Sequence, residues 1–500
     1  MAIKRYFANA DNTITNAYQA NLSTRGTGSN MGQADILEVF SIYAQQSSTS
    51  TELSRVLIQF PVSDISTDRT AGSIPASGSV SFYLKLYNAE HARTLPKNYK
   101  MVVEGVSGSW EEGNGLDMED YTDLTYDKIG SNWTNRTGST AWSTAGGDYY
   151  NDSSSSFEQT FDKGNEDLEV DVTSLVEQWI AGDKDNHGFG IRLSSSYEAS
   201  SSSNPSGATT SYYTKKFFAR SSEYYFDRPV LEARWNSSKR DNRGNFYFSS
   251  SLAPAEENLN TLFMYNYIRG RLRDIAGSST AIPVLNLYYS SGSVPEGTAR
   301  YFRDSSNAAV NYLSASRVST GIYKAVFSVT SSAVTSTYPY LVDVWTMSGS
   351  ELHTGSVIVP KTHKFSNYNP DEKYVVSVTN MKRKYTKNQT ERFRLFVRTK
   401  NWSPNIYTVA KSTPANLMIE SASYQITRTA DSKVVVPYNT GSDSATMLSY
   451  DVSGNYFDFD MNMLEAGYTY GLKFSFYEDS MASYQEQPYM FKFRVEKDEY

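Results

Sequence analysis

Short stretches of the chain alternate apolar and polar residues, and turn-forming residues separate them. Val56, Ile58 and Phe60 share one side of an extended backbone, and residues 82–87 alternate in the same way. A period of two residues is typical of β-strands that bury one face. Similar stretches lie at residues 188–193, 230–235, 262–273, 282–289, 323–329, 340–345, 355–359, 374–378, 392–399, 417–428, 433–437, 456–460, 468–476 and 490–495. The pattern predicts an all-β protein built from many short strands.

One stretch of the first half, residues 171–181, has the period of a helix instead. Its apolar stripe consists of Leu175, Val176, Trp179 and Ile180. Ser174 and Glu177 have the spacing of a capping box, and Gly182 can end the last turn. We therefore expect one short helix that covers a sheet. The side chains expected to fill the core of this first domain, rather than to serve as ligand platforms, are Phe60, Trp110 and Trp179.

Two polar stretches divide the chain. Residues 236–245 are polar and charged, and residues 360–371 have a proline near each end. They predict three tandem β-sandwich domains, at residues 1–238, 246–360 and 371–500, which fold separately. The first is expected to be a jelly roll with the one short helix, and the other two to be Ig-like or fibronectin-like sandwiches. Residues 256–260 are expected to form a short helical turn.

The composition supports the β-rich prediction and narrows the class of protein. The chain has 39 Tyr, 24 Phe and only 20% charged residues, and its net charge of −7 disfavours nucleic acid as a partner. Cysteine is absent, so neither a disulfide framework nor a thiolate metal site can form. The N-terminal residues show no secretory signal, and no apolar run is long enough to insert into a membrane. The basic cluster at residues 382–398 is expected to be a solvated sheet face or a contact with an acidic subunit.

No sequence motif with catalytic specificity is present. The chain has no Walker loop, no HExxH and no GxSxG, and its four histidines lie in different regions. A Ser–His–Asp triad stays open, because its members need not be neighbours in sequence. An acidic stretch contains Glu111, Glu112, Asp117, Glu119, Asp120 and Asp123. It is interpreted first as a solvated loop, with a Ca²⁺ site and a glycosidase carboxylate pair as alternatives. We therefore expect a protein that is not an enzyme.

Several short sequences in the first 235 residues occur in an order that resembles the disaggregatase-related "DNRLRE" repeat domain. They are ADNTI at 10–14, NMG at 30–32, RVLIQF at 55–60, SWEEG at 109–113, DVTSLVEQW at 171–179, NHGFGI at 186–191 and RPVL at 228–231. The resemblance implies a jelly-roll sandwich similar to carbohydrate-binding modules, which bind or adhere. It also implies a structural Ca²⁺ near the first and closing strands, with Asp11 and Asp227 as candidate ligands.

Chained sandwiches without a leader sequence are typical of virion components, which are made in the host cytoplasm. We expect a structural protein of a tailed bacteriophage, in the neck, tail or baseplate, with copies of itself and other virion proteins as partners. A cell-surface glycan is a further expected ligand of residues 1–235. The alternatives are a carbohydrate-binding adhesion module of a bacterial surface or secreted protein, and, third, a polysaccharide depolymerase.

Aromatic residues at the start of the second domain are candidates for contacts between subunits. The candidates are Phe246, Tyr247, Phe248, Tyr265 and Tyr267. Tyrosine is favoured in interfaces because its ring buries area with little loss of rotamer entropy. The alternative is that these rings fill the core of the second domain itself.

Overall fold

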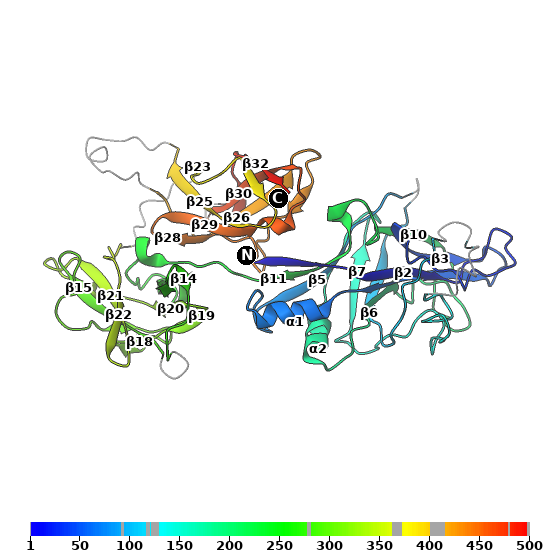
Figure 1. The fold of residues 1–500 in the computed structure, drawn as a ribbon, viewed down its shortest axis with the longest axis horizontal. Helices are drawn as coiled ribbons and strands as arrows, with labels where there is room; N and C mark the ends of the chain where they lie inside the picture. The colour runs from blue at the N-terminus through cyan, green and yellow to red at the C-terminus, as the bar shows by residue number, and fades with distance from the viewer. Residues whose placement is uncertain are drawn as a thin grey trace. The chain divides into compact units, whose positions relative to one another are not determined.

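A computed structural model shows an all-β protein with two compact units, Ala2–Asn236 and Ser237–Tyr500 (Figure 1). The structure describes residues 2–91, 95–116, 121, 130–277, 282–362, 373–400, 416–478 and 481–497. The boundary between the units falls at the start of the polar stretch 236–245. A finer division of the second unit into two separately folding domains stays a prediction.

The first unit contains two antiparallel sheets. The four-stranded sheet has the order β1 (Ile3–Phe7), β11 (Val230–Arg234), β5 (Ser81–Leu86) and β8 (Leu168–Asp171). The larger sheet has the order β10 (Tyr212–Phe218), β3 (Ile36–Tyr43), β4 (Thr51–Gln59), β9 (Phe189–Leu193), β6 (Tyr99–Gly105) and β7 (Ser156–Phe161), and β2 (Ala10–Thr15) also pairs with β4. Val56 and Ile58 on β4 are fully buried, as the alternating pattern predicted, and so are Phe82 and Leu84 on β5.

The predicted helix is present as α2 (Thr173–Ala181), which ends at Gly182 with a left-handed φ of 82°. The predicted capping box is wrong. The Asp171 carboxylate accepts the backbone N–H of Thr173 at 2.9 Å, and Glu177 forms a bidentate ion pair with Arg69 instead. Glu177 therefore binds a neighbouring helix rather than the start of its own.

That neighbouring helix, α1 (Val62–Thr70), was not predicted, so the expectation of one helix in this unit is wrong. Figure 1 shows α1 and α2 side by side, joined by the Arg69–Glu177 pair at 2.6 and 2.7 Å. Only Val62 and Ile65 are buried among its residues. Because the rest of the helix is Ser, Asp, Thr and Arg, no apolar stripe marks it in the sequence.

Two of the three predicted core side chains, Phe60 and Trp179, are buried, and the third, Trp110, is not. Phe60 is fully buried, and Trp179 is buried with its ring centroid 4.8 Å from that of Phe189. Trp110 is only half-buried, and its indole N–H donates to the carbonyl of His187 at 2.8 Å. It packs at the edge of a small apolar cluster outside the main core.

The second unit consists of further sheets. Its N-terminal part contains the sheet β12 (Asn260–Tyr265), β20 (Ile322–Phe327), β19 (Ser316–Ser319), the sheet β18 (Leu313–Ser314), β15 (Val284–Ser290), β21 (Tyr340–Met347), β22 (Ser350–Thr354), and the pairs β13 (Tyr267–Ile268) with β14 (Arg271–Leu272) and β16 (Phe302–Arg303) with β17 (Ala309–Val310). Its C-terminal part contains the sheet β23 (Tyr374–Val378), β25 (Thr390–Thr399), β29 (Gly454–Asp460), β28 (Ser449–Asp451) and the sheet β24 (Lys384–Thr386), β32 (Phe491–Glu496), β30 (Thr469–Glu478), β26 (Ala422–Arg428), β27 (Val434–Val436), with β31 (Ser483–Glu486) on β30. Only β24 and β32 pair in parallel among the described strands.

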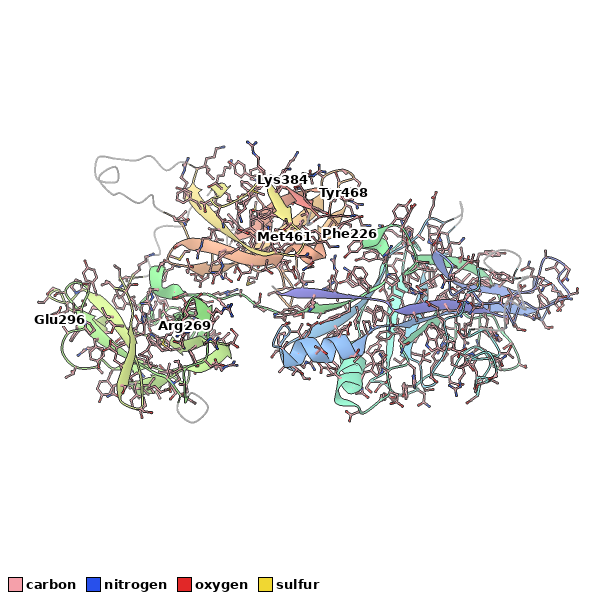
Figure 2. All side chains as sticks on the ribbon, viewed as in Figure 1. Phe226, Arg269, Glu296, Lys384, Met461 and Tyr468 are labelled. Atoms are coloured by element: carbon pink, nitrogen blue, oxygen red, sulfur yellow. The ribbon has the colours of Figure 1, made fainter. Side chains whose placement is uncertain are left out.

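Two strand predictions in the second unit are wrong. Residues 262–273 are not one strand, because β12 ends at Tyr265 and a hairpin of β13 and β14 follows. Arg269, labelled in Figure 2, and Gly270 have φ of 52° and 76°, which makes a two-residue hairpin turn. Residues 355–359 form no strand either; Ile358 only bridges to Leu341. The predicted helical turn is present at Glu256–Asn258.

The predicted subunit contact around residue 246 requires a correction. Phe246 and Phe248 lie in the core of the N-terminal part, together with Leu262 and Trp345, so these two rings are not available to a partner. Residues 246–248 pair with Lys361 in an extended conformation. Because side chains alternate along an extended backbone, Phe246 and Phe248 both face the core. Tyr247 and Tyr265 are half-buried, whereas Tyr267 on the hairpin is 60% exposed.

The polar stretch at residues 236–245 is more than a linker. Arg240 bridges to Tyr450 beside β28. Arg243 forms a bidentate ion pair with Asp343 at 2.5 and 2.7 Å. The second predicted linker lies at 360–371, and its residues 363–371 are outside the described residues.

Candidate functional site

A groove of about 1230 Å³ lies on the larger sheet of the first unit. It is on the side of β4 opposite to Val56 and Ile58, where Leu53 and Arg55 point. Its lining comes from β4, β6, β9 and the connections around residues 133–151 and 195–204. Side chains on several strands of one sheet can thus face the same ligand.

Two arginines form the floor of the groove. The register of β4 and β9 pairs Val56 with Ile191, so Arg55 and Arg192 are cross-strand neighbours on the same face. Each is neutralised by a bidentate glutamate. Arg55 binds Glu198 at 3.0 and 3.0 Å, and Arg192 binds Glu104 at 2.8 and 3.0 Å. The four side chains make a planar, polar surface whose charges cancel.

Burial shapes the electrostatics of this floor. Burial opposes the charge of the Arg55 guanidinium, but the Glu198 carboxylate outweighs that effect and the pKa of Arg55 is raised. Burial also raises the pKa of the Tyr149 hydroxyl, which donates to the carbonyl of Gly146 at 2.8 Å. Both shifts favour a charged Arg55 and a neutral Tyr149 near neutral pH.

An aromatic wall stands beside the floor. Trp133 and Tyr149 line the groove, whereas Trp142 packs behind them with Trp133 on Leu57 of β4. The guanidinium carbon of Arg55 lies 5.3 Å from the centroid of the Trp133 ring. Tyr149 lies over Gly190, where an added Cβ would come within 2.0 Å of the tyrosine ring. Glycine at 190 is therefore required for this ring to sit against the sheet.

The rim of the groove is polar and rich in hydroxyl groups. Its members include Asn16, Ser143, Thr144, Asn151, Ser201, Ser202, Ser203 and Asn204. Asn204 donates to the carbonyl of Ser195 at 2.7 Å, which fixes the shape of this segment. The half-buried Tyr150 also lines the groove. Hydroxyl and amide groups at the rim can both donate and accept hydrogen bonds.

The residues of the groove were not predicted from the sequence. Arg192 stands in an otherwise apolar strand and Arg55 directly precedes the apolar residues Val56, Leu57 and Ile58, and that was the signal available. The partners of Arg55 and Arg192 lie 143 and 88 residues away along the chain, so the pairing could not be read from spacing.

The candidate calcium ligands occupy different settings. Asp11 is buried, and its carboxylate accepts the backbone N–H of Arg220 at 2.6 Å. Arg220 in turn binds Glu112 of the predicted acidic loop in a bidentate pair. Asp227 lies half-buried in a short 3-10 turn. Among the described residues, no three carboxylate or imidazole groups gather as a metal site would require.

Only part of the predicted acidic loop belongs to the described residues. Asp117, Glu119, Asp120 and Asp123 are outside the described residues. Glu111 accepts the backbone N–H of Gly138 at 3.2 Å. Of the four histidines, His363 is also outside the described residues.

The Asp11 cluster predicts a dependence of stability on pH. Burial raises the pKa of Asp11 from 3.8 to about 7, and the neighbouring Glu112 adds to this, against the effect of Arg220. The folded state therefore binds this proton more tightly than the unfolded state between these two values. The free energy of unfolding, relative to an Asp11→Asn variant, is expected to fall as the pH rises from about 4 to about 7, by at most about 1.4 kcal/mol per pH unit.

Thermal unfolding of both proteins across this pH range checks the prediction. A difference in melting temperature that stays constant with pH would contradict it. Because Asn cannot titrate, the comparison removes the contributions of all other groups that both proteins share.

The predicted basic cluster in the second unit is largely paired. Arg392 binds Asp458, and Arg394 binds Asp451, each through two hydrogen bonds. Lys384, labelled in Figure 2, lies 2.8 Å from Glu496. These contacts fit the predicted solvated sheet face. A second hollow, of about 1360 Å³, is lined by residues between 240 and 261 together with Glu420 and Tyr450. Polar side chains of its lining bind one another, as Asn245 donates to Glu420.

Comparisons with known proteins identify no family. No protein-family model matches the chain, and neither does any curated protein. Solved structures show only weak similarity, as three of them illustrate. The fibronectin(III)-like modules of Clostridium thermocellum CbhA share 11% identity, with 52% of this chain and 90% of that chain covered and a TM-score of 0.14. The trypsin-activated alpha-2-macroglobulin of Escherichia coli shares 8% identity, with 88% and 24% covered and a TM-score of 0.16.

The third is a DUF4785 family protein of Legionella pneumophila, with 7% identity, coverage of 98% and 91%, and a TM-score of 0.13. Across the described part of the chain, no helix combines the length and apolar character needed to cross a membrane.

Proposed function

We propose that the chain is a non-enzymatic binding protein whose first unit holds a neutral saccharide in the groove. The observation that carries the proposal is the floor of two paired arginine–glutamate bridges beside an aromatic wall. Ligand sites commonly combine apolar and aromatic walls with a few precisely placed polar groups. Neighbouring hydroxyls of a sugar match the fixed donors and acceptors of such bridges, and its C–H faces suit aromatic rings.

The charge of the groove favours a neutral ligand over an anionic one. Its lining contains three arginines and three acidic residues, so the formal charges sum to zero; these are Arg55, Arg136, Arg192, Glu104, Asp148 and Glu198. An anion site would need an excess of cationic donors. A polar but uncharged molecule loses little by meeting a surface whose own charges are already paired.

The same geometry favours binding over hydrolysis of a glycan. A glycosidase needs one carboxyl group that keeps its proton in a dry pocket, opposite a second carboxylate. Glu104 and Glu198 each bind an arginine through both carboxylate oxygens. Neither is arranged as a proton donor, so the depolymerase alternative receives no support from the groove.

A glycan array with the full chain tests the proposal, followed by titration of the retained sugar. Tyr150→Ala removes a half-buried ring from the groove and is expected to weaken binding about tenfold or more. Tyr213→Ala is the matched control, because Tyr213 is 64% exposed in the same unit and does not line the groove. No retained glycan, or equal losses in the two variants, would refute the proposal.

The place of the chain in a tailed-phage virion remains a proposal of the sequence analysis. Its support is the series of β-sheet domains and the cysteine-free, tyrosine-rich composition. The expected partners are copies of the chain and other virion proteins. Mass spectrometry of purified particles is the test, and absence of the chain from them would refute this assignment.

A further inference from the structure

The interior of the first unit contains a lysine that the proposed binding groove does not use. Lys215 on β10 is only 1% exposed. Its Nζ lies 5.1 and 5.0 Å from the ring centroids of Phe161 and Phe217. Among the described residues, no carboxylate lies within ion-pair distance of this Nζ. A buried lysine without a counter-ion is costly, and it therefore calls for an explanation.

The polar partners of Lys215 are neutral. Nζ donates to Asn88 Oδ1 at 2.6 Å, to the carbonyl of Glu166 at 2.6 Å and to the carbonyl of Gly164 at 3.2 Å. The three acceptors could simply cage an ammonium group. However, Asn88 differs from the two carbonyls, because its amide carbon can be attacked by an amine.

The backbone fixes Asn88 against this lysine. Asn88 bridges to Phe217 in an antiparallel pair, flanked by hydrogen bonds from Ala89 to Lys216 and from Phe218 to Tyr87. Lys215 and Phe217 lie on the same, buried face of β10, so Asn88 is the diagonal cross-strand neighbour of Lys215. The contact therefore does not depend on a mobile loop.

Two further side chains bind Asn88, one at its side-chain oxygen and one at its backbone N–H. His91 Nε2 lies 2.6 Å from the same Oδ1. The Asp167 carboxylate accepts the backbone N–H of Asn88 at 2.7 Å. The amide thus has an amine and an imidazole at its oxygen, with a carboxylate beside its backbone.

We propose that Lys215 and Asn88 condense to an intramolecular isopeptide bond in the folded protein. The Nζ lone pair attacks Cγ of Asn88, a Cγ–Nζ bond forms, and the Cγ–Nδ2 bond breaks. One proton passes from the amine to the departing nitrogen, and one ammonia leaves. The reaction is an amide exchange, so it needs no oxidant, reductant or cofactor.

The environment supports each step. Burial lowers the pKa of Lys215 to about 8, so part of the amine is unprotonated near neutral pH. Burial also lowers the pKa of His91 to about 4, which leaves a neutral ring whose Nε2–H can donate to the oxygen that becomes negative in the tetrahedral intermediate. Asp167 is the charged group that most favours the protonated form of Lys215, against the effect of burial, and its carboxylate holds the backbone N–H of Asn88.

The bond would lock the sandwich. It joins β10 of the larger sheet to the segment that follows β5 of the four-stranded sheet, and it closes a loop across 127 positions of sequence. A chain without cysteine cannot form a disulfide, so an isopeptide bond is the available covalent link between side chains of this unit. Such a link would suit a protein that carries mechanical load.

The intact mass of the full chain, measured under denaturing conditions after incubation at pH 9, tests the inference. We expect a mass lower than that of the sequence by one ammonia, and a branched tryptic peptide that joins residues 88 and 215. Asn88→Ala should show its full sequence mass, and Asn88→Asp should lose one water instead of one ammonia. Lys215→Met lacks the amine and should also show its full sequence mass. Where Lys215→Met fails to fold, the loss of water from Asn88→Asp still distinguishes condensation from other losses.

One side reaction must be separated by the peptide map. Succinimide formation at Asn114–Gly115 also releases one ammonia. A loss located at Asn114, or the full sequence mass in the wild-type chain after incubation, would overturn the inference and leave Lys215 as a caged ammonium group. Glycan binding by the groove is a separate measurement and is not affected by either result.

Discussion

Replacing Arg243 by alanine is expected to lower the free energy of unfolding of the second unit by about 3–5 kcal/mol. Arg243 reaches from the polar stretch 236–245 to Asp343 on β21. The Asp343 side chain has 0% exposure. Without the guanidinium, the Asp343 carboxylate would remain buried, and among the described side chains only the Trp345 indole N–H, at 2.7 Å, would still donate to it.

The electrostatics of the pair explain this size of effect. Burial opposes the charge of Arg243, but hydrogen bonds and attraction from Asp343 outweigh it and raise the pKa of Arg243. Removing one member of a buried pair costs more than the pair contributes, because the other charge stays desolvated. The stretch that the sequence analysis treated as a linker should therefore be required for the stability of the sheet that contains β21.

A matched control lies in the same part of the unit. Arg317 forms a bidentate pair with Asp274, but the two side chains are 51% and 38% exposed. Arg317→Ala is expected to cost at most about 1 kcal/mol, because water replaces the lost partner. Adding Asp343→Asn to Arg243→Ala should recover part of the loss, since the amide is neutral. Urea unfolding of the full chain measures all four proteins, and equal effects of the two arginine variants would contradict the prediction.

The alternating pattern located most strands, but it did not show where a strand ends and the chain reverses. In β25 burial follows the two-residue pattern directly, and in β5 it does so except at Lys85, which is also buried. At residues 262–273 the same pattern continues through Asn266 and Gly270, although the backbone turns there. Apolar alternation reports which side chains are buried, but a reversal of the chain leaves that alternation intact.

Residues that depend on distant partners were out of reach of the sequence. Glu177 fits a capping box as well as it fits Arg69, and only the fold decides between them. Phe246 and Phe248 were candidates for subunit contacts, with the core of the second domain as the alternative, and the structure places both rings in that core. The groove was missed for the same reason, since Glu104 and Glu198 meet their arginines only when β4, β6 and β9 are assembled.

The second large effect is expected in the first unit, where Trp179→Ala should lower the free energy of unfolding by about 3–5 kcal/mol. Trp179 is 6% exposed, and α2 buries it with Leu175 and Val176. Its ring meets Phe189 edge-on at 4.8 Å, and Phe189 in turn meets Phe60 at 6.0 Å. Alanine would leave a large cavity at the junction of helix and sheet.

The indole N–H allows the cavity to be separated from polar effects. Trp179 Nε1 is buried without a hydrogen-bond partner, so Trp179→Phe loses no hydrogen bond and is expected to cost less than about 1.5 kcal/mol. Trp110→Ala is a second comparison, because Trp110 is half-buried at the edge of a small cluster and should cost less than Trp179→Ala. Thermal unfolding of the full chain orders the three variants. A shift of less than a degree or two for Trp179→Ala would mean that the ring contributes little to the core, and would return Trp179 to the candidates for ligand contact.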